Sequence, residues 1–201
     1  MSSKPTPDLK TVDRLLKAMV VFSRTANHVL ESHAIEAAAG EVLSSSKVQT
    51  LRLLGERGEQ MSTRVARFLG VTKPAVSQII DSMVQNGLVV RRGAKEDRRE
   101  VRLRLTAKGQ RLFQNLRREQ RHLVRNAVRQ ANANAANRWA KALLELIEGL
   151  TQADKAFKDF CLQCAAHGDP ECVLVGGEAE CLFLQHEAQP PGRSKSRRSR
   201  K

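Results

Sequence analysis

Residues 65–106 read VARFLGVTKPAVSQIIDSMVQNGLVVRRGAKEDRREVRLRLT, and this stretch decides the fold. Apolar residues recur in it with the spacing of one helix face, at Val76, Ile79, Ile80 and Met83. Thr72 is placed to cap this helix, Pro74 fits its first turn, and Gly87 suits the position after its end. Gly70 suits a tight turn from a shorter preceding helix.

After this helix the apolar pattern changes to a period of two. Val101, Leu103 and Leu105 alternate with charged residues, as in a strand with one buried face. We expect its partner at residues 88–91, with the basic segment 92–99 joining the two strands. Two helices, a turn between them and a hairpin with an arginine-rich tip predict a winged helix-turn-helix in a mainly α fold.

The stretch resembles the MarR family of bacterial transcription regulators in the order and spacing of its motifs. The matching residues are Leu51, Leu54, Val65-Ala66, Leu69-Gly70-Val71, Val76-Ser77, Asn86-Gly87-Leu88-Val89, Asp97-Arg98-Arg99 and Leu105-Thr106-Ala107-Lys108-Gly109. Flanking helices extend the likeness over residues 9–157 but not over the end of the chain. The resemblance implies a homodimer that binds double-stranded DNA and responds to an effector.

The residue types in this unit suit contact with duplex DNA. A helix with a polar, partly basic outer face fits a major groove, where Gln pairs with adenine and Lys reaches guanine. An arginine at a hairpin tip suits a narrow minor groove; the resemblance gives this role to Arg99 and a steadying role to Asp97. The candidate DNA-contacting residues are Ser62, Thr72, Lys73, Ser77, Gln78, Asp81, Arg92, Lys95, Asp97, Arg98 and Arg99.

The positive charge is concentrated where a polyanion could dock. Of the net charge of +14, residues 47–108 carry +8, residues 109–160 carry +5 and the tail 193–201 carries +6. Residues 161–192, in contrast, carry −5 and no Lys or Arg. Because such a tail adds sequence-independent affinity, a non-specific DNA-coating protein is the alternative to a regulator.

Helices are expected on both sides of the winged unit. We predict a disordered arm at 1–8 and a helix over 9–38, which either packs on its own domain or builds a dimer. A short helix over 47–56 should pack Leu51 inward, and Ser62 should cap the next helix. The dimerisation helices continue over 107–157, with Thr106 as cap and a bend at 131–134. The exposed side of the first of them is rich in arginine: Arg111, Arg117, Arg118, Arg121, Arg125 and Arg129.

All four cysteines lie in the segment 161–187, as Cys161, Cys164, Cys172 and Cys181. A hairpin turning at Gly176-Gly177 would place Cys172 opposite Cys181, in reach of the Cys-x-x-Cys pair. Four thiolates suit zinc, and an iron–sulfur cluster is the alternative, with His167 as a candidate substitute ligand. Reversible disulfides without metal and unrelated free cysteines stay open. The response would then be to metal or redox state.

Several protein classes are excluded or disfavoured by what the sequence lacks. It has no run of eighteen apolar residues and no apolar leader after Met1, so we expect no membrane span and a cytoplasmic protein. It has no phosphate loop, no Gly-x-Ser-x-Gly and no His-Glu-x-x-His, so we predict no enzyme. The tail 188–201 should be disordered. The function predicted is a sequence-specific transcription regulator, a repressor in the simplest mechanism, on near-palindromic operators.

Overall fold

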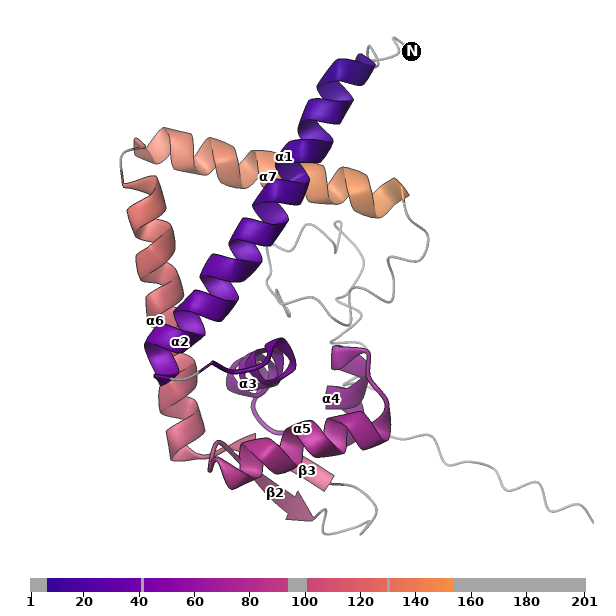
Figure 1. Cartoon of the computed structure of the whole chain (residues 1–201), viewed down its shortest axis with the longest axis vertical. Helices are drawn as coiled ribbons and strands as arrows, with labels where there is room; N and C mark the ends of the chain where they lie inside the picture. The colour runs from indigo at the N-terminus through magenta and orange to yellow at the C-terminus, as the bar shows by residue number, and fades with distance from the viewer. Residues whose placement is uncertain (1–6, 41, 94–100, 130, 154–201) are drawn as a thin grey trace, which may run out of the picture.

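The computed structural model describes residues 7–40, 42–93, 101–129 and 131–153. A winged-helix body lies at one end, and two long helices, α1 and α7, lie at the other (Figure 1). None of the helices in the described part is long and apolar enough to cross a membrane.

The N-terminal helix runs without a break from Leu9 to Ala39 but changes its winding on the way. It comprises α1 (Leu9–Asn27), the π-helical segment η1 (His28–His33) and α2 (Ala34–Ala39). Asp8 caps it by accepting from the Thr11 N–H at 2.8 Å, and this hydrogen bond lowers the pKa of the Asp8 carboxyl. The helix predicted over 9–38 is confirmed, whereas the π-helical segment was not predicted.

The winged body contains α3 (Ser45–Arg57), α4 (Ser62–Leu69), α5 (Lys73–Gln85) and a small antiparallel sheet. The sheet has the order β1-β3-β2, formed by β1 (Gln60–Met61), β2 (Val89–Gly93) and β3 (Val101–Leu105). The predicted hairpin is present, with Val89 opposite Leu105 and Arg91 opposite Leu103. The third strand, β1, was missed because two residues carry no alternation to detect.

Two helices begin differently from the sequence prediction. Helix α3 begins at Ser45 and not at residue 47, with Ser44 at its N-cap. The prediction that Ser62 caps α4 is wrong: Ser62 is the first helical residue, and Met61 holds the N-cap position without a side-chain bond. The reason is non-local, because Met61 pairs with Arg102 of β3, which fixes the extended backbone before the helix.

The end of α5 has the hydrogen bonds of a Schellman motif. The Leu88 N–H donates to Met83 O at 2.9 Å, and the Gly87 N–H donates to Val84 O at 2.9 Å, with Gly87 at φ 67°. The predicted role of Gly87 is thus confirmed, and because Leu88 completes this motif, β2 begins one residue later than expected.

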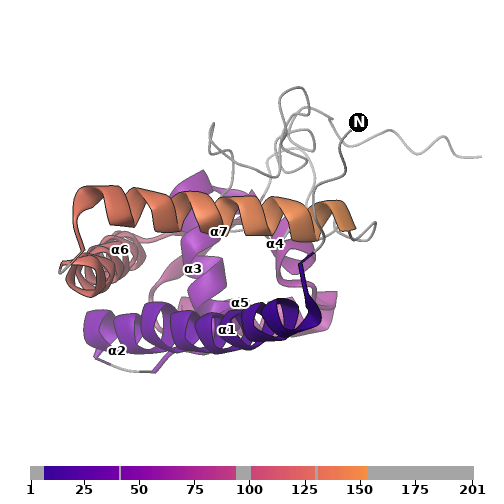
Figure 2. The same ribbon diagram turned by 90° about the horizontal axis from the view of Figure 1, so that it is seen from above.

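Two helices follow the sheet and meet at a corner (Figure 1). Helix α6 (Ala107–Val128) is capped by Thr106, whose Oγ1 accepts from the Gly109 N–H at 3.0 Å, as predicted. Helix α7 (Ala133–Ala153) begins after Asn132, whose Oδ1 accepts from the Ala135 N–H at 2.8 Å, at the predicted bend. Figure 2 shows α1 and α7 on opposite sides of the molecule, although they cross in Figure 1.

The hydrophobic core lies in the winged body and beneath α2 and α6. Its fully buried members come from α2, α3, α4, α5, β3 and α6: Ile35, Leu51, Leu54, Val65, Ile80, Met83, Leu103 and Leu116. In contrast, α1 has no buried residue. The described residues therefore form one core, from which the length of α1 projects.

Candidate nucleic-acid interface

The turn between α4 and α5 sets the position of the second helix. Gly70 ends α4 in the left-handed region at φ 64°, and the Val71 N–H donates to Ala66 O at 3.0 Å. Two residues later, Thr72 caps the start of α5, and its Oγ1 accepts from the Ala75 N–H at 3.4 Å. Pro74 lies in the first turn, where no N–H is needed. These local features leave the direction of α5 little freedom.

Helix α5 is divided into an apolar and a polar face. Val76, Ile80 and Met83 are buried in the core, as the periodicity predicted. The opposite face exposes Lys73, Ser77, Gln78 and Asp81, which carry the hydrogen-bonding groups named as candidate DNA contacts. Thr72, at the helix start, is exposed as well. The structure thus brings five predicted site residues onto one exposed helix face.

A cavity of about 330 Å³ lies where this face meets α4 and the sheet. Its polar lining residues are Lys73, Ser77 and Arg91, together with Ser62 and Thr63 at the start of α4. The remaining lining residues are apolar: Val76, Ile80, Val101 and Leu103. Ser62, which was predicted both as a helix cap and as a DNA contact, thus lines this cavity and does not cap α4.

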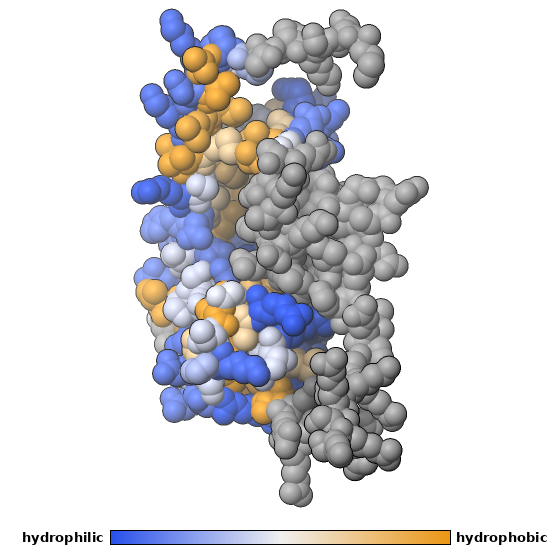
Figure 3. Space-filling view, turned by 90° about the vertical axis from the view of Figure 1, so that its right-hand side faces the viewer, coloured by the Kyte–Doolittle hydropathy of each residue, from blue (hydrophilic) through white to orange (hydrophobic). Residues whose placement is uncertain are grey.

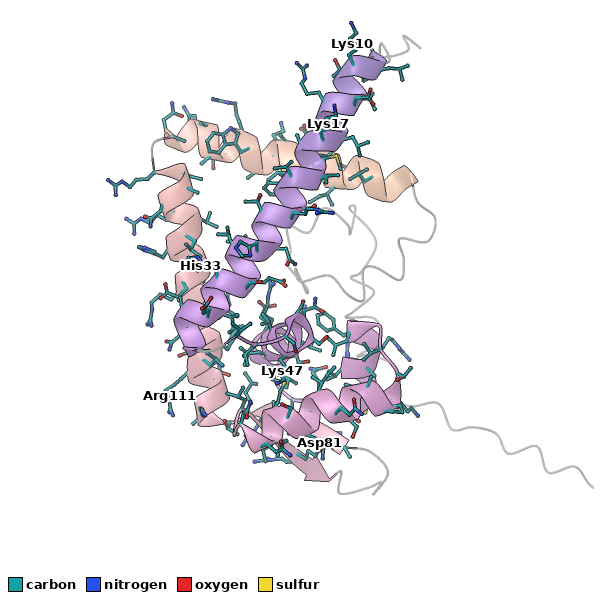
Figure 4. All side chains as sticks on the ribbon, viewed as in Figure 1. Lys10, Lys17, His33, Lys47, Asp81 and Arg111 are labelled. Atoms are coloured by element: carbon teal, nitrogen blue, oxygen red, sulfur yellow. The ribbon has the colours of Figure 1, made fainter. Side chains whose placement is uncertain are left out.

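Asp81 is engaged by a residue that the sequence analysis did not single out. Arg91 Nη1 lies 2.7 Å from Asp81 Oδ1 and ties β2 to α5, with side chains 40% and 50% exposed. Figure 4 shows Asp81 on α5 beside the strands. Arg91 pairs with Leu103 and follows Val89 by two residues, so it shares their inward face. Strand alternation could therefore have indicated that Arg91 turns toward α5.

A second ion pair joins the central strand of the sheet to the residue just before β1. Arg102 Nη1 of β3 lies 3.5 Å from Glu59 Oε1, just before β1. Arg92 is exposed and lies opposite Arg102 in the β2–β3 register. The predicted wing residues Lys95, Asp97, Arg98 and Arg99 lie outside the described residues.

A separate basic surface follows α6. Its exposed arginines repeat at helical spacing and include Arg111, Arg118, Arg121, Arg125 and Arg129. Figure 4 shows Arg111 on the outer side of α6, away from α5. Arg117 instead lies over the Phe113 ring, 5.7 Å from its centroid. The basic residues named above thus lie on two separate surfaces, the α5 side and the side of α6.

The candidate metal ligands cannot be placed. Cys161, Cys164, Cys172, Cys181 and His167 all lie outside the described residues. Within the described ranges, no group of three or more His, Cys, Asp or Glu side chains could hold a metal ion. The zinc site and the cluster alternative therefore stay predictions.

The projecting helices expose an unusual amount of apolar surface. On α1, the exposed side chains include Leu9, Val12, Leu16, Val20 and Phe22, with Leu16 57% exposed. On α7, they include Trp139, Leu143, Leu144, Ile147 and Leu150, with Trp139 51% exposed. Figure 3 shows hydrophobic side chains gathered at this end of the molecule. Exposed apolar side chains gathered in this way are typical of a surface that binds a partner.

The winged helix-turn-helix of this chain is similar in sequence to known proteins. The sequence model of the MarR family matches residues 43–101. The chain is 32% identical over 97 residues to the HTH-type transcriptional repressor YetL of Bacillus subtilis, covering 47% of this chain and 56% of that protein. It is 33% identical over 86 residues to the HTH-type transcriptional regulator PetP of Rhodobacter capsulatus, covering 43% of this chain and 52% of that protein. The chain thus spans about half the length of these relatives.

Solved structures show the same fold at lower identity. A MarR family protein from Bacillus stearothermophilus has a TM-score of 0.62 at 19% identity, covering 73% of this chain and 99% of that chain. Streptococcus pneumoniae FabT, solved in complex with DNA, has a TM-score of 0.58 at 20% identity, covering 73% of this chain and 100% of that chain. These likenesses extend well beyond the winged unit, into the flanking helices.

Proposed function

We propose that this chain, whose winged helix-turn-helix belongs to the MarR family, is a dimeric, sequence-specific DNA-binding transcription regulator. The observation that carries the proposal is the capped helix α5, which exposes Lys73, Ser77 and Gln78 from a rigid core. The names of its relatives, a transcriptional repressor and a transcriptional regulator, support the same class. Both names are those of regulators, and we propose no enzymatic activity for the chain.

In this proposal α5 enters the major groove and the wing follows the adjacent backbone. Gln78 can bond an adenine edge and Lys73 a guanine or a phosphate, because both side chains are exposed near the start of the helix. Arg91 and Ser62, which line the cavity beside α5, would bind phosphate oxygens. Arg99 of the wing is assigned to the minor groove, with Asp97 supporting it, on the resemblance alone.

The exposed apolar faces of α1 and α7 are assigned to a homodimer interface. The alternative interpretation, that α1 packs on its own domain, is disfavoured because α1 has no buried residue within the described chain. Two copies would present two α5 helices about 34 Å apart, matching half-sites one turn of B-DNA apart. Repression would follow from blocking a promoter, and an effector would act by changing the α5 separation.

Footprinting on genomic fragments, at physiological salt, separates this function from its alternative. A regulator protects a few discrete, near-palindromic sites, and its affinity for them exceeds that for random DNA by about 10³ or more. Uniform protection would instead identify a DNA-coating protein, and we would withdraw the assignment to α5. The salt dependence should be steep in both cases, because both use phosphate contacts.

The input signal is proposed from the cysteine content of residues 161–181. Four cysteines in a stretch without Lys or Arg favour a bound cation, with zinc proposed first and an iron–sulfur cluster second. Purification without oxygen, with metal analysis and an absorption spectrum, tests this. One zinc per chain supports a structural or metal-sensing site, and iron with sulfide supports a cluster. If neither is present, the thiols themselves would be the redox-responsive groups.

A further inference from the structure

The π-helical segment η1 leaves one backbone carbonyl available to another helix. In an α-helix the Ala34 N–H would bond the carbonyl four residues earlier, that of Leu30. Here it donates to Val29 O and Glu31 O and passes over Leu30 O. Gln120 of α6 takes that place, with its Nε2 donating to Leu30 O at 2.6 Å. The side chain of Gln120, from another helix, thus donates to the carbonyl that the π-helical winding passes over.

The next residue, Glu31, joins the same segment to α3. Its carboxylate accepts from Arg52 Nη1 and Ser45 Oγ of α3 and from Asn27 Nδ2, each at 3.4 Å. The side chains of Glu31 and Arg52 are only 18% and 25% exposed, so water screens this ion pair less than a surface pair. Gln120 of α6 and Arg52 of α3 therefore contact η1 from two different helices.

The position of η1 gives these contacts their significance. Ala34 and Ile35, which follow it directly, are 0% exposed and belong to the core. Helix α1, which precedes it, has no buried residue and carries the apolar face assigned to the dimer. The contacts that hold η1 therefore set the angle between the apolar face of α1 and helix α5. Local π-helical turns inside α-helices often mark functional sites.

We propose that Gln120 and Glu31 are positioning residues that fix the separation of the two α5 helices in the dimer. They would thereby select which spacing between half-sites the protein accepts. The proposal rests on the dimeric DNA-binding function above and adds its specificity for spacing. The residues touch no DNA in this scheme, so they act only through the angle of α1.

The test uses a site selected from random DNA with the full-length wild-type chain. The centre of this site is lengthened or shortened by one and two base pairs, which shifts one half-site by about 3.4 Å and 34° per pair. Wild-type affinity should fall about tenfold or more for each pair, as for a mismatched base pair. Gln120→Glu and Glu31→Gln should reduce that loss to about threefold or less. The first replaces the donor to Leu30 O by an acceptor, and the second removes the charge that pairs with Arg52, both with little change in volume.

Matched controls carry the same charge changes at exposed positions. Gln114→Glu lies on α6 and Glu36→Gln on α2, and both should keep the wild-type spacing profile. Arg52→Gln breaks the ion pair with Glu31 from the other side and gives a second route should Gln120→Glu fail to fold. Circular dichroism and sedimentation confirm that each variant is folded and dimeric.

The shape of the spacing profile decides the outcome. A flatter profile in Gln120→Glu, Glu31→Gln or Arg52→Gln supports the positioning role. A uniform loss of affinity at all spacings, or an unchanged profile in every folded variant, overturns it while leaving the proposed function intact. If the wild-type chain selects no site, the proposed function fails, and this inference fails with it.

Discussion

Gly109→Ala tests how tightly α6 is packed against Leu88, the residue that completes the motif at the end of α5. Gly109 is buried in the first turn of α6, and a Cβ built there would lie 2.1 Å from Leu88 O and 3.1 Å from Leu88 C. That oxygen belongs to the backbone and already accepts from the Thr106 N–H at 3.0 Å. The contact can be relieved only by moving α6 away from Leu88.

The magnitude follows from what such a movement disturbs. Overpacking costs about 1–3 kcal/mol, and each weakened capping bond costs about 1 kcal/mol. The bonds at risk are Thr106 N–H to Leu88 O and Thr106 Oγ1 to Gly87 O, the latter 2.6 Å long. Ala gains about 1 kcal/mol over Gly in helix propensity. We therefore expect the free energy of unfolding to fall by about 2–4 kcal/mol.

Urea and thermal unfolding, followed by circular dichroism at one fixed protein concentration, measure this change. A loss of this size corresponds to a decrease of about 4–16 °C in Tm. The matched control is Gly149→Ala, where an added Cβ meets nothing within 4 Å in exposed helix α7. This variant should be up to about 1 kcal/mol more stable than wild type. If Gly109→Ala is as stable as wild type, the packing argument is refuted.

Three further substitutions address the proposed interfaces. Asp81→Asn frees Arg91 and removes a negative charge from the α5 face, so in gel-shift titrations the affinity for random DNA should rise and the preference for the selected site should fall. The control Asp13→Asn on α1 should change neither quantity. Equal effects of the two substitutions would contradict this role of Asp81. Arg99→Ala should weaken operator binding about tenfold with unchanged unfolding, and unaltered affinity would remove the wing from the mechanism. Leu16→Glu buries a charge in the proposed dimer interface, so sedimentation should detect monomers at micromolar concentration; an intact dimer would place the interface elsewhere.

The elements that local rules control were predicted well from the sequence. The caps at Thr72 and Thr106, the turn at Gly70 and the end of α5 at Gly87 depend on side-chain and backbone bonds within a few residues. The apolar faces of α5 and β3 follow from their periods, so their buried sides were also predictable. The exposed polar side of α5, including Lys73, was identified for the same reason.

The features that only the tertiary structure decided depend on contacts between residues far apart in the chain. β1 exists because it pairs with β3, and that pairing also displaces the N-cap of α4 from Ser62 to Met61. The ion pair of Asp81 with Arg91 required the β2 register, and the π-helical winding of η1 is accompanied by a bond from Gln120, 90 residues away. Sequence periodicity records which face of an element is apolar, but it does not record which partner that face or its carbonyls will meet.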